Sequence, residues 1–367
     1  MPQDIDASQL NTLIAAANAT WVAGKTSVSD LPPQQQLNRL GYVPAGGEET
    51  LEQRTAASAA KISATASGAI GAPAAFDWRN VNGQNYITPI TDQKHCGSCV
   101  AFGATAAVEG TFRVQRGNPG LAVNLSEASL FFCNGPGAGA GACPGGGWYM
   151  TPAMDAYKTT GVPDEACFPY ADGTQQLPCS NRCSDWQSRA VKITGWHTVS
   201  GADIKTWLST KGPLATCFTV YNDFFSYTSG VYKHVSGGVA GGHCVCCVGY
   251  NDAGQFWICK NSWGPNWGES GYFCIAYGEC GIDSTMWAVE GIVETAWLYN
   301  TRVIGLWTID QDRNAWAYLD GIGWRRIAWD NDNIFIDLLR LLAAAKEGGR
   351  PVNVYQDNGV IKQIYVL

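Results

Sequence analysis

The stretch DQKHCGSCVAF, residues 92–102, decides the fold, because it places two cysteines three positions apart just before an alanine-rich run. Taken alone, Cys96 and Cys99 are open to three interpretations: a redox pair, half of a metal site, or one nucleophile beside one structural cysteine. Apolar and small residues continue through residues 99–116, and Gly117 follows. This pattern predicts a helix that begins at Cys99 and ends before the glycine.

The composition around this stretch excludes some classes of function and sets a compartment. The 367 residues are enough for two domains, and the formal net charge is -7 with no basic run, which disfavours nucleic-acid binding. No apolar run reaches the roughly 18–20 residues of a membrane span. The 14 cysteines favour an oxidising compartment. Residues 1–10 lack the apolar core of a signal peptide, and we expect that an export signal has been removed.

The chain divides into three parts by composition. Residues 8–18 have helical spacing, and residues 55–75 are small-residue-rich, as in an exposed linker that proteases cut. A dense part runs from Phe76 to about residue 292, with Ser126 as a helix cap in its first half and strand patterns from about residue 213. This order predicts an α+β fold of two lobes, one helical and one barrel-like, with a cleft between them.

Residues 293–367 predict a small separate α+β module without cysteine. Three β-like stretches at 302–310, 314–321 and 324–330 precede a helix over 333–349, with Asn333 as a possible cap and Gly348 as its stop. Residues 352–367 predict a hairpin that turns at Asp-Asn-Gly. We expect the tryptophans of this module to be core residues rather than platforms for sugars.

Nucleophilic thiol catalysis needs a thiolate, a base, a group that orients the base, and oxyanion donors. Of the four histidines, His95 adjoins Cys96, and His197 and His234 lie in ordinary strand or turn contexts. His243 stands out, because two glycines precede it and a strand follows it in AGGHCVCCVGY. Eighteen residues further on, Asn261 opens the loop KNSWGPNWGESGY.

These motifs, in this order, resemble the papain-like cysteine peptidases, most closely the cathepsin B branch. The resemblance covers residues 76 to about 292, through FDWRN, DQKHCGSC, LSEASLFFC, CPGGGW, KNSWGPNWGESGYF and ECGID. Residues 18–41 are similar to the short inhibitory propeptide of that branch. The resemblance therefore implies a zymogen: a propeptide and activation linker at 1–75, a two-lobed peptidase domain at 76–292, and the module at 293–367.

The resemblance assigns catalytic roles one position at a time. Cys99 would be the nucleophile, at a helix N-terminus whose partial positive charge lowers the pKa of a thiol. His243 would be the base and then the acid, and Asn261 would hold its ring. Trp263 would shield that hydrogen bond from water, and Gln93 would donate to the oxyanion together with the backbone N–H of Cys99.

The resemblance also implies a substrate strip, a specificity pocket and disulfides. Gly145 and Gly146 would present backbone to an extended peptide, while Gly147, Trp148, Cys244 and Thr285 fall where the family shapes its main pocket. The implied disulfides are Cys96–Cys143, Cys133–Cys179 and Cys167–Cys183. Seven further cysteines remain besides Cys99, an odd number, so at least one more thiol is free; most are expected to be buried small hydrophobes: Cys217, Cys244, Cys246, Cys247, Cys259, Cys274 and Cys280.

Two departures from the family pattern stand out: the first concerns packing and leaves the chemistry unchanged, and the second bears on activity. Val100 stands where the family usually has tryptophan after the nucleophile. The histidine-bearing insertion that gives cathepsin B its carboxydipeptidase activity is absent, because residues 168–183 are too few and lack histidine. We therefore expect an endopeptidase with an open cleft, acting on peptides and proteins, with its own propeptide as inhibitor and no cofactor or metal.

Other classes of function stay open as alternatives. A thiol–disulfide oxidoreductase would use Cys96 and Cys99 as a pair and leave Cys143 free. A catalytically silent binding protein would keep the scaffold and act through residues 293–367. Zinc at the HCVCCV run is disfavoured, since strand alternation puts Cys244 and Cys246 on one face and Cys247 on the other. We expect secretion or an acidic, lysosome-like compartment, where acid would weaken the ion pairs that hold the propeptide.

Overall fold

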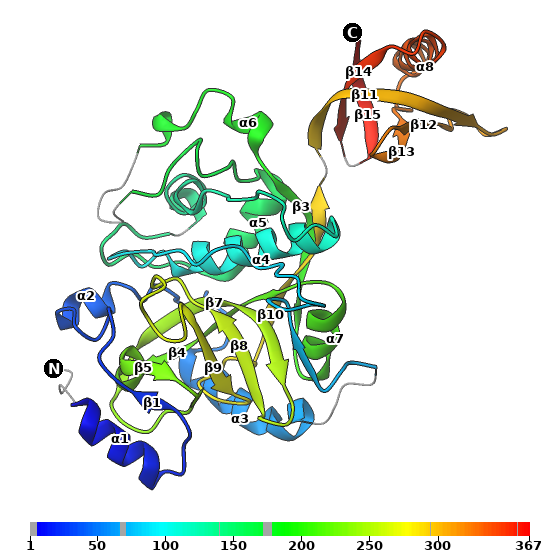
Figure 1. Cartoon of the computed structure of the whole chain (residues 1–367). Helices are drawn as coiled ribbons and strands as arrows, with labels where there is room; N and C mark the ends of the chain where they lie inside the picture. The colour runs from blue at the N-terminus through cyan, green and yellow to red at the C-terminus, as the bar shows by residue number, and fades with distance from the viewer. Residues whose placement is uncertain (1–5, 67–70, 139, 172–177, 294, 358) are drawn as a thin grey trace. The chain divides into compact units, whose positions relative to one another are not determined.

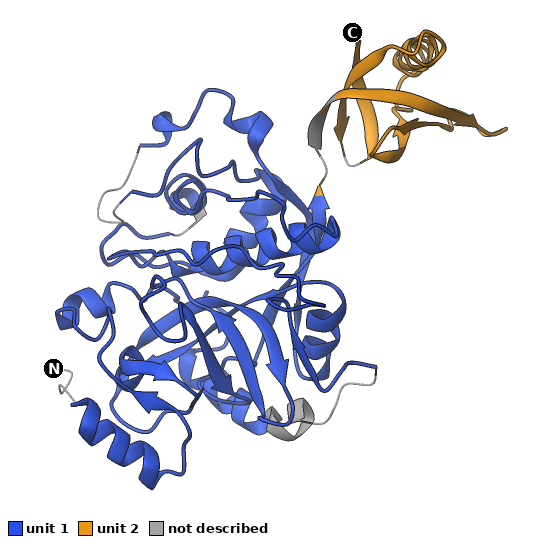
Figure 2. Cartoon of the chain, in the orientation of Figure 1, with its two compact units in different colours: residues 1–292 blue, residues 293–367 orange. Residues whose placement is uncertain are grey.

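The structure is a computed structural model that describes residues 6–66, 71–138, 140–171, 178–293, 295–357 and 359–367. The chain separates into two compact units, residues 1–292 and residues 293–367 (Figure 2). Within the described residues, no helix has both the length and the apolar character to cross a membrane.

The first unit begins with a segment that wraps on the strand-rich lobe. It contains helix α1 (Ala7–Ala16), strand β1 (Val22–Ala23), helix α2 (Pro33–Leu37) and helix α3 (Leu51–Ala66), coloured blue in Figure 1. Helix α1 confirms the helical spacing of residues 8–18, with Leu10 and Ile14 buried. Strand β1 pairs with strand β5 (Tyr227–Ser229), and the indole N–H of the buried Trp21 donates to the carbonyl of Lys233 at 2.8 Å.

The expectation of an exposed linker over residues 55–75 is wrong in its first half. Residues 51–66 form helix α3, and the side chains of Arg54 and Ser58 are buried. The physical reason is that alanine has the highest helix propensity, so a small-residue-rich segment becomes a helix when it has a surface to pack on. Residues 67–70 lie outside the described residues.

The helical lobe is built around helix α4 (Cys99–Gln115), which ends before Gly117 as predicted, with Gly117 at φ +58°. Residues 99–111 of α4 are buried. Gly103 lets α4 pack closely on strand β7, because a Cβ at this position would lie 3.1 Å from the backbone of Val245. Ser126 caps the next helical turn by accepting from the backbone N–H of Ser129 at 2.9 Å. The other helices of this lobe are η1 (Ser129–Asn134), η2 (Pro136–Ala138), α5 (Met150–Thr159), η3 (Cys179–Asn181) and α6 (Trp186–Arg189).

The second lobe is an eight-stranded sheet in the order β3-β10-β4-β7-β8-β9-β6, with strand β2 (Ala75–Asp77) pairing with β7 (Figure 1). Helix α7 (Ala202–Thr210) and the short helix η4 (Asn222–Ser226) connect its strands. The strands on the main path are β3 (Lys192–Val199), β10 (Met286–Val293), β4 (Leu214–Tyr221), β7 (Val239–Asn251), β8 (Phe256–Lys260), β9 (Tyr272–Ala276) and β6 (Val231–Tyr232).

Two cores flank strand β7, which joins the lobes. Cys244 and Cys246 face the core shared with α4, while Cys247 faces the core of the sheet's other side. This confirms the alternation predicted for the HCVCCV run. A helical lobe and a strand-rich lobe on either side of one long strand confirm the predicted α+β two-lobed fold.

The second unit is a closed barrel in the order β11-β12-β13-β15-β14. Its elements are β11 (Thr295–Thr308), β12 (Ala315–Leu319), β13 (Gly323–Ile327), α8 (Asp332–Glu347), β14 (Pro351–Asp357) and β15 (Val360–Val366). Helix α8 ends at Gly348 as predicted, but its cap is Asn331, whose side chain accepts from the backbone N–H groups of Asn333 and Ile334. The cap therefore lies two residues before the predicted Asn333.

The expectation that the tryptophans of this unit belong to its core is wrong for several of them. Trp307 and Trp324 are each 46% exposed, and Trp329 is 39% exposed. The barrel is too small to enclose indoles. Its interior is filled by aliphatic side chains and alanines, such as Val303, Ala317 and Leu342.

Candidate active site

Cys99 is the first residue of α4 and is fully buried. Its thiol is free, whereas Cys96 is bonded to Cys143. The helix N-terminus presents backbone N–H groups and partial positive charge to the sulfur. The sequence places the cysteine here because Ser98 precedes the helix in a non-helical conformation (φ -93°, ψ 13°) and the alanine-rich run propagates it.

His243 lies near the start of the long central strand β7, and its ring is held on one side only. Its Nε2 lies 2.8 Å from the side-chain oxygen of Asn261. An amide oxygen can only accept, so Nε2 carries a proton and the lone pair of the neutral ring is on Nδ1. This Nδ1 is buried and, among the described residues, has no hydrogen-bond partner. It is thus available as a base.

Trp263 covers the bond between His243 and Asn261. Its ring centroid is 4.8 Å from that of the imidazole, and the indole is 1% exposed. The loop is fixed at Gly264, which has φ +79° and donates its N–H to the carbonyl of Thr91 at 3.0 Å. Water is therefore kept from the bond that orients the imidazole.

Gln93 is held by hydrogen bonds on both ends of its side-chain amide. Its oxygen accepts from the hydroxyl of Ser262 at 2.7 Å. This bond fixes which end of the amide is the donor, and Nε2 donates to the carbonyls of Cys96 at 2.8 Å and Arg39 at 2.9 Å. The donor predicted for an oxyanion is therefore occupied by a carbonyl of the N-terminal segment.

The N-terminal segment passes between the two lobes immediately after Arg39. Gly41 and Tyr42 each donate a backbone N–H to the carbonyl of Gly242, at 3.1 and 3.0 Å. On the other side, Trp148 donates to the carbonyl of Gly41 at 2.7 Å and accepts from Val43 at 3.1 Å. Three consecutive residues thus pair with the helical lobe through Trp148 and with the strand-rich lobe through Gly242.

This passage fits because Gly41 has no side chain. A Cβ on Gly41 would lie 1.8 Å from the carbonyl oxygen of Gly97, two residues before Cys99. The segment therefore lies directly against the backbone that leads to the thiol. A residue of any other type at position 41 would have to move away from it.

Burial under this segment suppresses the charge of both Cys99 and His243. Desolvation raises the pKa of the Cys99 thiol to about 11, although backbone hydrogen bonds from Cys244, Gly41 and Val100 act in the opposite direction. Desolvation also lowers the pKa of His243 to about 4, against the hydrogen bond to Asn261, which raises it. In this form the thiol and the imidazole are both neutral at neutral pH.

The residues predicted to bind substrate are spread over three environments. Trp148 contacts the N-terminal segment through its backbone, and Gly147 lies beside Gly41, with 3.1 Å from its Cβ position to the carbonyl oxygen. Gly146 is buried against Gly97, whose Cβ position is 1.8 Å from the Gly146 oxygen. Gly145 is exposed, with open space around its Cβ position.

Thr285, and Cys217 as the disulfide partner of Cys244, lie beside a side chain that sequence reasoning missed. Arg54 of helix α3 is 4% exposed and donates through Nη2 to the carbonyls of Cys217 at 2.9 Å and Thr285 at 3.2 Å. Its guanidinium also lies 5.6 Å from the ring centroid of Trp287. The signal in the sequence was one arginine in an alanine-rich segment, and nothing in that segment told where the arginine would point.

Cys217 and Cys244 are bonded to each other, which corrects the expectation that both are unpaired buried residues. They face each other directly in the antiparallel pair β4·β7, with Cα atoms 4.0 Å apart. Such a pair is visible only once the strand register is known. The three disulfides implied by the resemblance are also present in the structure. Besides Cys99, the free thiols among the described residues are Cys246, Cys247, Cys259, Cys274 and Cys280.

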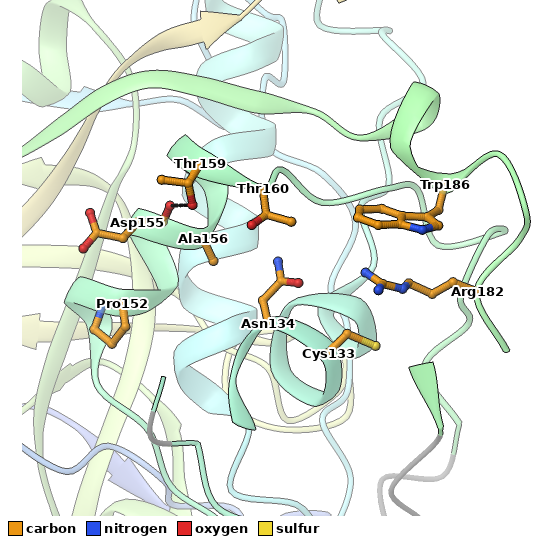
Figure 3. Close-up of a pocket in the computed structure, with 9 residues that line it drawn as sticks. All are labelled: Cys133, Asn134, Pro152, Asp155, Ala156, Thr159, Thr160, Arg182 and Trp186. Atoms are coloured by element: carbon orange, nitrogen blue, oxygen red, sulfur yellow. Dashed lines mark hydrogen bonds between the residues drawn. The ribbon is translucent and has the colours of Figure 1, made fainter. Parts of the chain in front are cut away.

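A separate cavity of about 530 Å³ lies in the helical lobe (Figure 3). Asn134 and Thr160 face it from one side and Trp186 and Arg182 from the other, with the guanidinium 3.9 Å from the indole centroid. Cys133, which also lines this cavity, is bonded to Cys179. The lining holds no free thiol, so the candidate nucleophile remains Cys99.

Comparison with known proteins agrees with this geometry. Residues 72–289 match the family described as papain family cysteine protease. Over 289 residues the chain is 40% identical to cathepsin B-like CP3 of Giardia intestinalis, covering 75% of this chain and 91% of that protein. It is 33% identical over 241 residues to a gut-specific cysteine proteinase of Caenorhabditis elegans, covering 58% of this chain and 72% of that protein.

Solved structures show the same fold. The structure of procathepsin B S9 from Trypanosoma congolense has a TM-score of 0.62 at 22% identity, covering 78% of this chain and 98% of that one. Digestive procathepsin L2 from the Tenebrio molitor larval midgut has a TM-score of 0.58 at 26% identity, covering 77% and 88%. The fold and the comparisons define a cysteine-type peptidase, a hydrolase. The chain belongs to the papain family of cysteine proteases, and its curated relatives include cathepsin B-like enzymes.

Proposed function

We propose that the chain is the zymogen of a cysteine endopeptidase in which Cys99 and His243 form the reactive pair. The observation that carries this proposal is the passage of residues 41–43 between Trp148 and Gly242, over a buried free thiol at a helix N-terminus. A segment that fills the position of a substrate, at the meeting point of two lobes, is what a latent peptidase needs.

The reaction follows from the donors and acceptors at this point. In the open enzyme the thiolate of Cys99 attacks the carbonyl carbon of the scissile bond, and the carbon–nitrogen bond breaks as imidazolium Nδ1 of His243 gives its proton to the leaving amine. Nε2 of Gln93 and the backbone N–H of Cys99 stabilise the oxyanion. Water, deprotonated by His243, then hydrolyses the thioester. Asn261 is a positioning residue that keeps the imidazole in the required tautomer.

Residues 1–75 act as the inhibitor in this proposal, and three contacts support it. Arg39 places its carbonyl on Nε2 of Gln93, where an oxyanion would otherwise accept. Gly41 covers the approach to Cys99. Arg54 donates to the carbonyls of Cys217 and Thr285. The segment blocks the oxyanion donor, the nucleophile and the neighbouring pocket at once.

Acid would open this latent form through His243. A histidine whose pKa is lowered by burial binds its proton less readily in the closed form than in the open form. At a pH above its ordinary pKa the histidine is neutral in both forms, and the closed form has its full stability. As the pH falls towards the lowered pKa, the open form binds the proton first, and the closed form loses stability relative to it. For His243 the window runs from about 6.5 down to about 4, which corresponds to about 3 kcal/mol in favour of opening. The imidazole is fully buried, so little of this is screened.

The ion pair that ties the segment to the peptidase domain is a poorer acid switch. Arg39 and Asp92 are 3.0 Å apart. Burial opposes ionisation of Asp92, but Arg39 and Lys94 outweigh it and lower the pKa of this carboxyl below its ordinary value. The pair therefore persists at pH values where His243 is already driven to bind a proton. We propose protonation of His243, rather than loss of ion pairs, as the acid trigger.

An oxidising and acidic compartment suits these features. Four disulfides form among the described residues. Burial raises the pKa of Glu165 to about 7, and a raised carboxyl contributes stability at low pH that is lost as the pH rises through that value. Glu165 therefore makes the peptidase domain more stable in acid than at neutral pH. Secretion or delivery to a lysosome-like compartment would provide both conditions.

Endopeptidase action is proposed because residues 168–183 are too few to form an insertion that would close the site, and they contain no histidine. Residues 172–177 lie outside the described residues. Residues 293–367 form an appended unit with its own core, and peptide hydrolysis would not depend on it. Activity of a chain that ends after residue 292, on short peptides and on whole proteins, separates a catalytic role of the module from a targeting role.

The test of the proposed function compares the full chain with Cys99→Ala at pH 4.5 and pH 7.5. The wild-type chain should lose roughly its first 60–75 residues in acid and then cleave an internally quenched peptide at an internal bond. Cys99→Ala should stay at full length and inactive. Cleavage by the alanine variant, or release of C-terminal dipeptides alone by the wild type, would contradict the proposal.

A further inference from the structure

The C-terminal unit has the chain path of a five-stranded oligomer-binding barrel. Its strands follow the order β11-β12-β13-β15-β14, strand β13 runs parallel to β15, and α8 lies between β13 and β14 (Figure 1). This is the path of the OB-fold, whose face around the second and third strands binds oligonucleotides or oligosaccharides. Fold alone does not assign a ligand, so the side chains on that face must decide.

The outer face of β11–β13 is an array of aromatic residues in two rows. Strand pairing sets Trp307 opposite Trp316, and Trp316 opposite Arg326. In the next row, Gly305 is opposite Tyr318, and Tyr318 is opposite Trp324. The alternation of β12 confirms the direction: Ala315, Ala317 and Leu319 are buried inside, and the two aromatic residues between them point out.

The array is exposed, and its shape is fixed by contacts within it. The rings of Tyr318 and Trp324 meet edge to face, with centroids 5.2 Å apart. The Trp324 ring reaches over Gly305, where its Cη2 lies 3.3 Å from the position of a Cβ. Nearly half of the Trp307 and Trp324 side chains is nevertheless in contact with solvent. Two exposed indoles on one sheet face make this surface a candidate for ligand binding.

The net charge of the C-terminal unit disfavours a nucleic acid as the ligand. Residues 293–367 contain eight basic and nine acidic residues, a formal charge of -1. Binding of single-stranded nucleic acid combines aromatic stacking with a positively charged groove. Here the loop between β11 and β12 carries Asp310 and Asp312. Arg326, the arginine on the face of the array, lies over the ring of Trp329 at 3.8 Å, and Arg325 points to the other side of β13, where it binds Gln356.

The closed barrel excludes a peptide that would bind by adding a strand to the sheet. Peptides that bind β-proteins commonly add a strand to a free sheet edge. The barrel is closed through the pairs β11·β14 and β13·β15, so its described residues offer no such edge. The ligand chemistry that fits this face best is a flat, uncharged molecule with apolar ring faces and hydroxyls at its rim, because the indole and phenol rings of the array each combine an apolar face with one polar group.

We propose that the outer face of β11–β13 is a carbohydrate-binding surface that takes an uncharged oligosaccharide, with Trp307 and Trp324 as the stacking residues. The sugar rings lie on the two indoles, and hydroxyls meet the polar groups beside them. This site is independent of the peptidase reaction. It holds the enzyme on a polysaccharide-bearing surface and raises the local concentration of substrates that share that surface.

The experiment uses the full chain carrying Cys99→Ala, which prevents self-cleavage. It is incubated with insoluble cellulose and chitin and with an array of uncharged oligosaccharides, and binding is followed by retention and by tryptophan fluorescence. At least one of these carbohydrates should be bound. Trp307→Ala and Trp324→Ala should each weaken binding about threefold to tenfold, and the double variant should abolish it.

The matched control is Tyr365→Ala, which removes an exposed aromatic residue of the same barrel from strand β15. It should bind as the parent does, and thermal unfolding should show that all variants are folded. The proposal is overturned if no carbohydrate is bound, or if binding survives the double substitution. It is equally overturned if a single-stranded oligonucleotide or a protein, rather than a carbohydrate, is what the two tryptophans retain.

Discussion

Substitution of Gly41 by alanine tests the latent form at its tightest contact. The added Cβ would lie 1.8 Å from the carbonyl oxygen of Gly97, 2.4 Å from its carbonyl carbon and 2.7 Å from its Cα. All three atoms are backbone, in the turn that leads into α4, and none can rotate away. The N-terminal segment must therefore lift from this position in the variant.

The size of the effect follows from the hydrogen bonds that this movement breaks. Four backbone bonds hold residues 41–43: two to the carbonyl of Gly242, and two exchanged with Trp148. Each contributes about 0.5–1.5 kcal/mol net. Loss of most of them amounts to about 2–4 kcal/mol, which raises the population of the open form by about 30-fold to 1000-fold.

The assay measures how fast a peptide epoxide labels Cys99 in the full-length chain at pH 7.5, where the proposed acid trigger does not act. When opening is rapid and reversible, the labelling rate reports the open population. Gly46→Ala is the matched control, because it makes the same change in the same segment with no atom within 4 Å of the added Cβ. If Gly41→Ala is folded and is labelled no faster than Gly46→Ala, the passage of residues 41–43 does not hold the enzyme latent.

Three further predictions concern the same unit. Asn261→Ala should lower kcat about tenfold at unchanged KM. It should also move the alkaline limb of the pH profile to lower pH, because the hydrogen bond from Asn261 raises the pKa of His243 and is lost in the variant. An unchanged pH profile would contradict the positioning role of Asn261. Labelling of Cys99 in the full chain, corrected for the reactivity of the thiolate, should be slowest near pH 7–8. The rate at which the N-terminal segment opens should increase as the pH falls from about 6.5 to about 4. A constant rate of opening across this range would show that His243 is not the trigger. Arg54→Met should lower the melting temperature of the full chain by several degrees and speed acid activation, because the hydrogen bonds of the guanidinium to Cys217 and Thr285 are lost. Ala60→Met, an exposed position on the same helix, is the control and should change neither quantity. Equal effects of the two substitutions would mean that Arg54 does not hold helix α3 on the peptidase domain.

The parts of the fold that could be predicted from the sequence are those set by local patterns. Short runs rich in apolar and β-branched residues predicted the strands of the second lobe, and the run after Cys99 predicted α4 to within a residue or two. The bonding of Cys217 to Cys244 could not be read in this way, because it depends on which residues face each other across β4 and β7. That register is set by the whole sheet.

The candidate site divides along the same line. Cys99, His243 and Asn261 could be named from motifs, since each stands in a local sequence that fixes its own backbone. The partners of Gln93 could not, because one of them, the carbonyl of Arg39, comes from a segment 54 residues away. The exposure of Trp307 and Trp324 could not be predicted from the sequence either. Tryptophan in a strand is usually buried, and only the small diameter of a five-stranded barrel forces the indoles outward.

If Cys99 and His243 are the reactive pair, their neutral state makes latency electrostatic as well as steric. An ion pair of thiolate and imidazolium requires the thiol to be the stronger acid, and here the pKa of Cys99 is about 11 and that of His243 about 4. A gap of about seven pKa units opposes charge separation by on the order of 10 kcal/mol. Even two charges in contact at about 4 Å recover only about 4 kcal/mol at an effective dielectric constant of about 20. The covered thiol is therefore a poor nucleophile wherever the N-terminal segment stays in place, and removal of Gly41 from its position supplies both the space and the water that an ion pair needs.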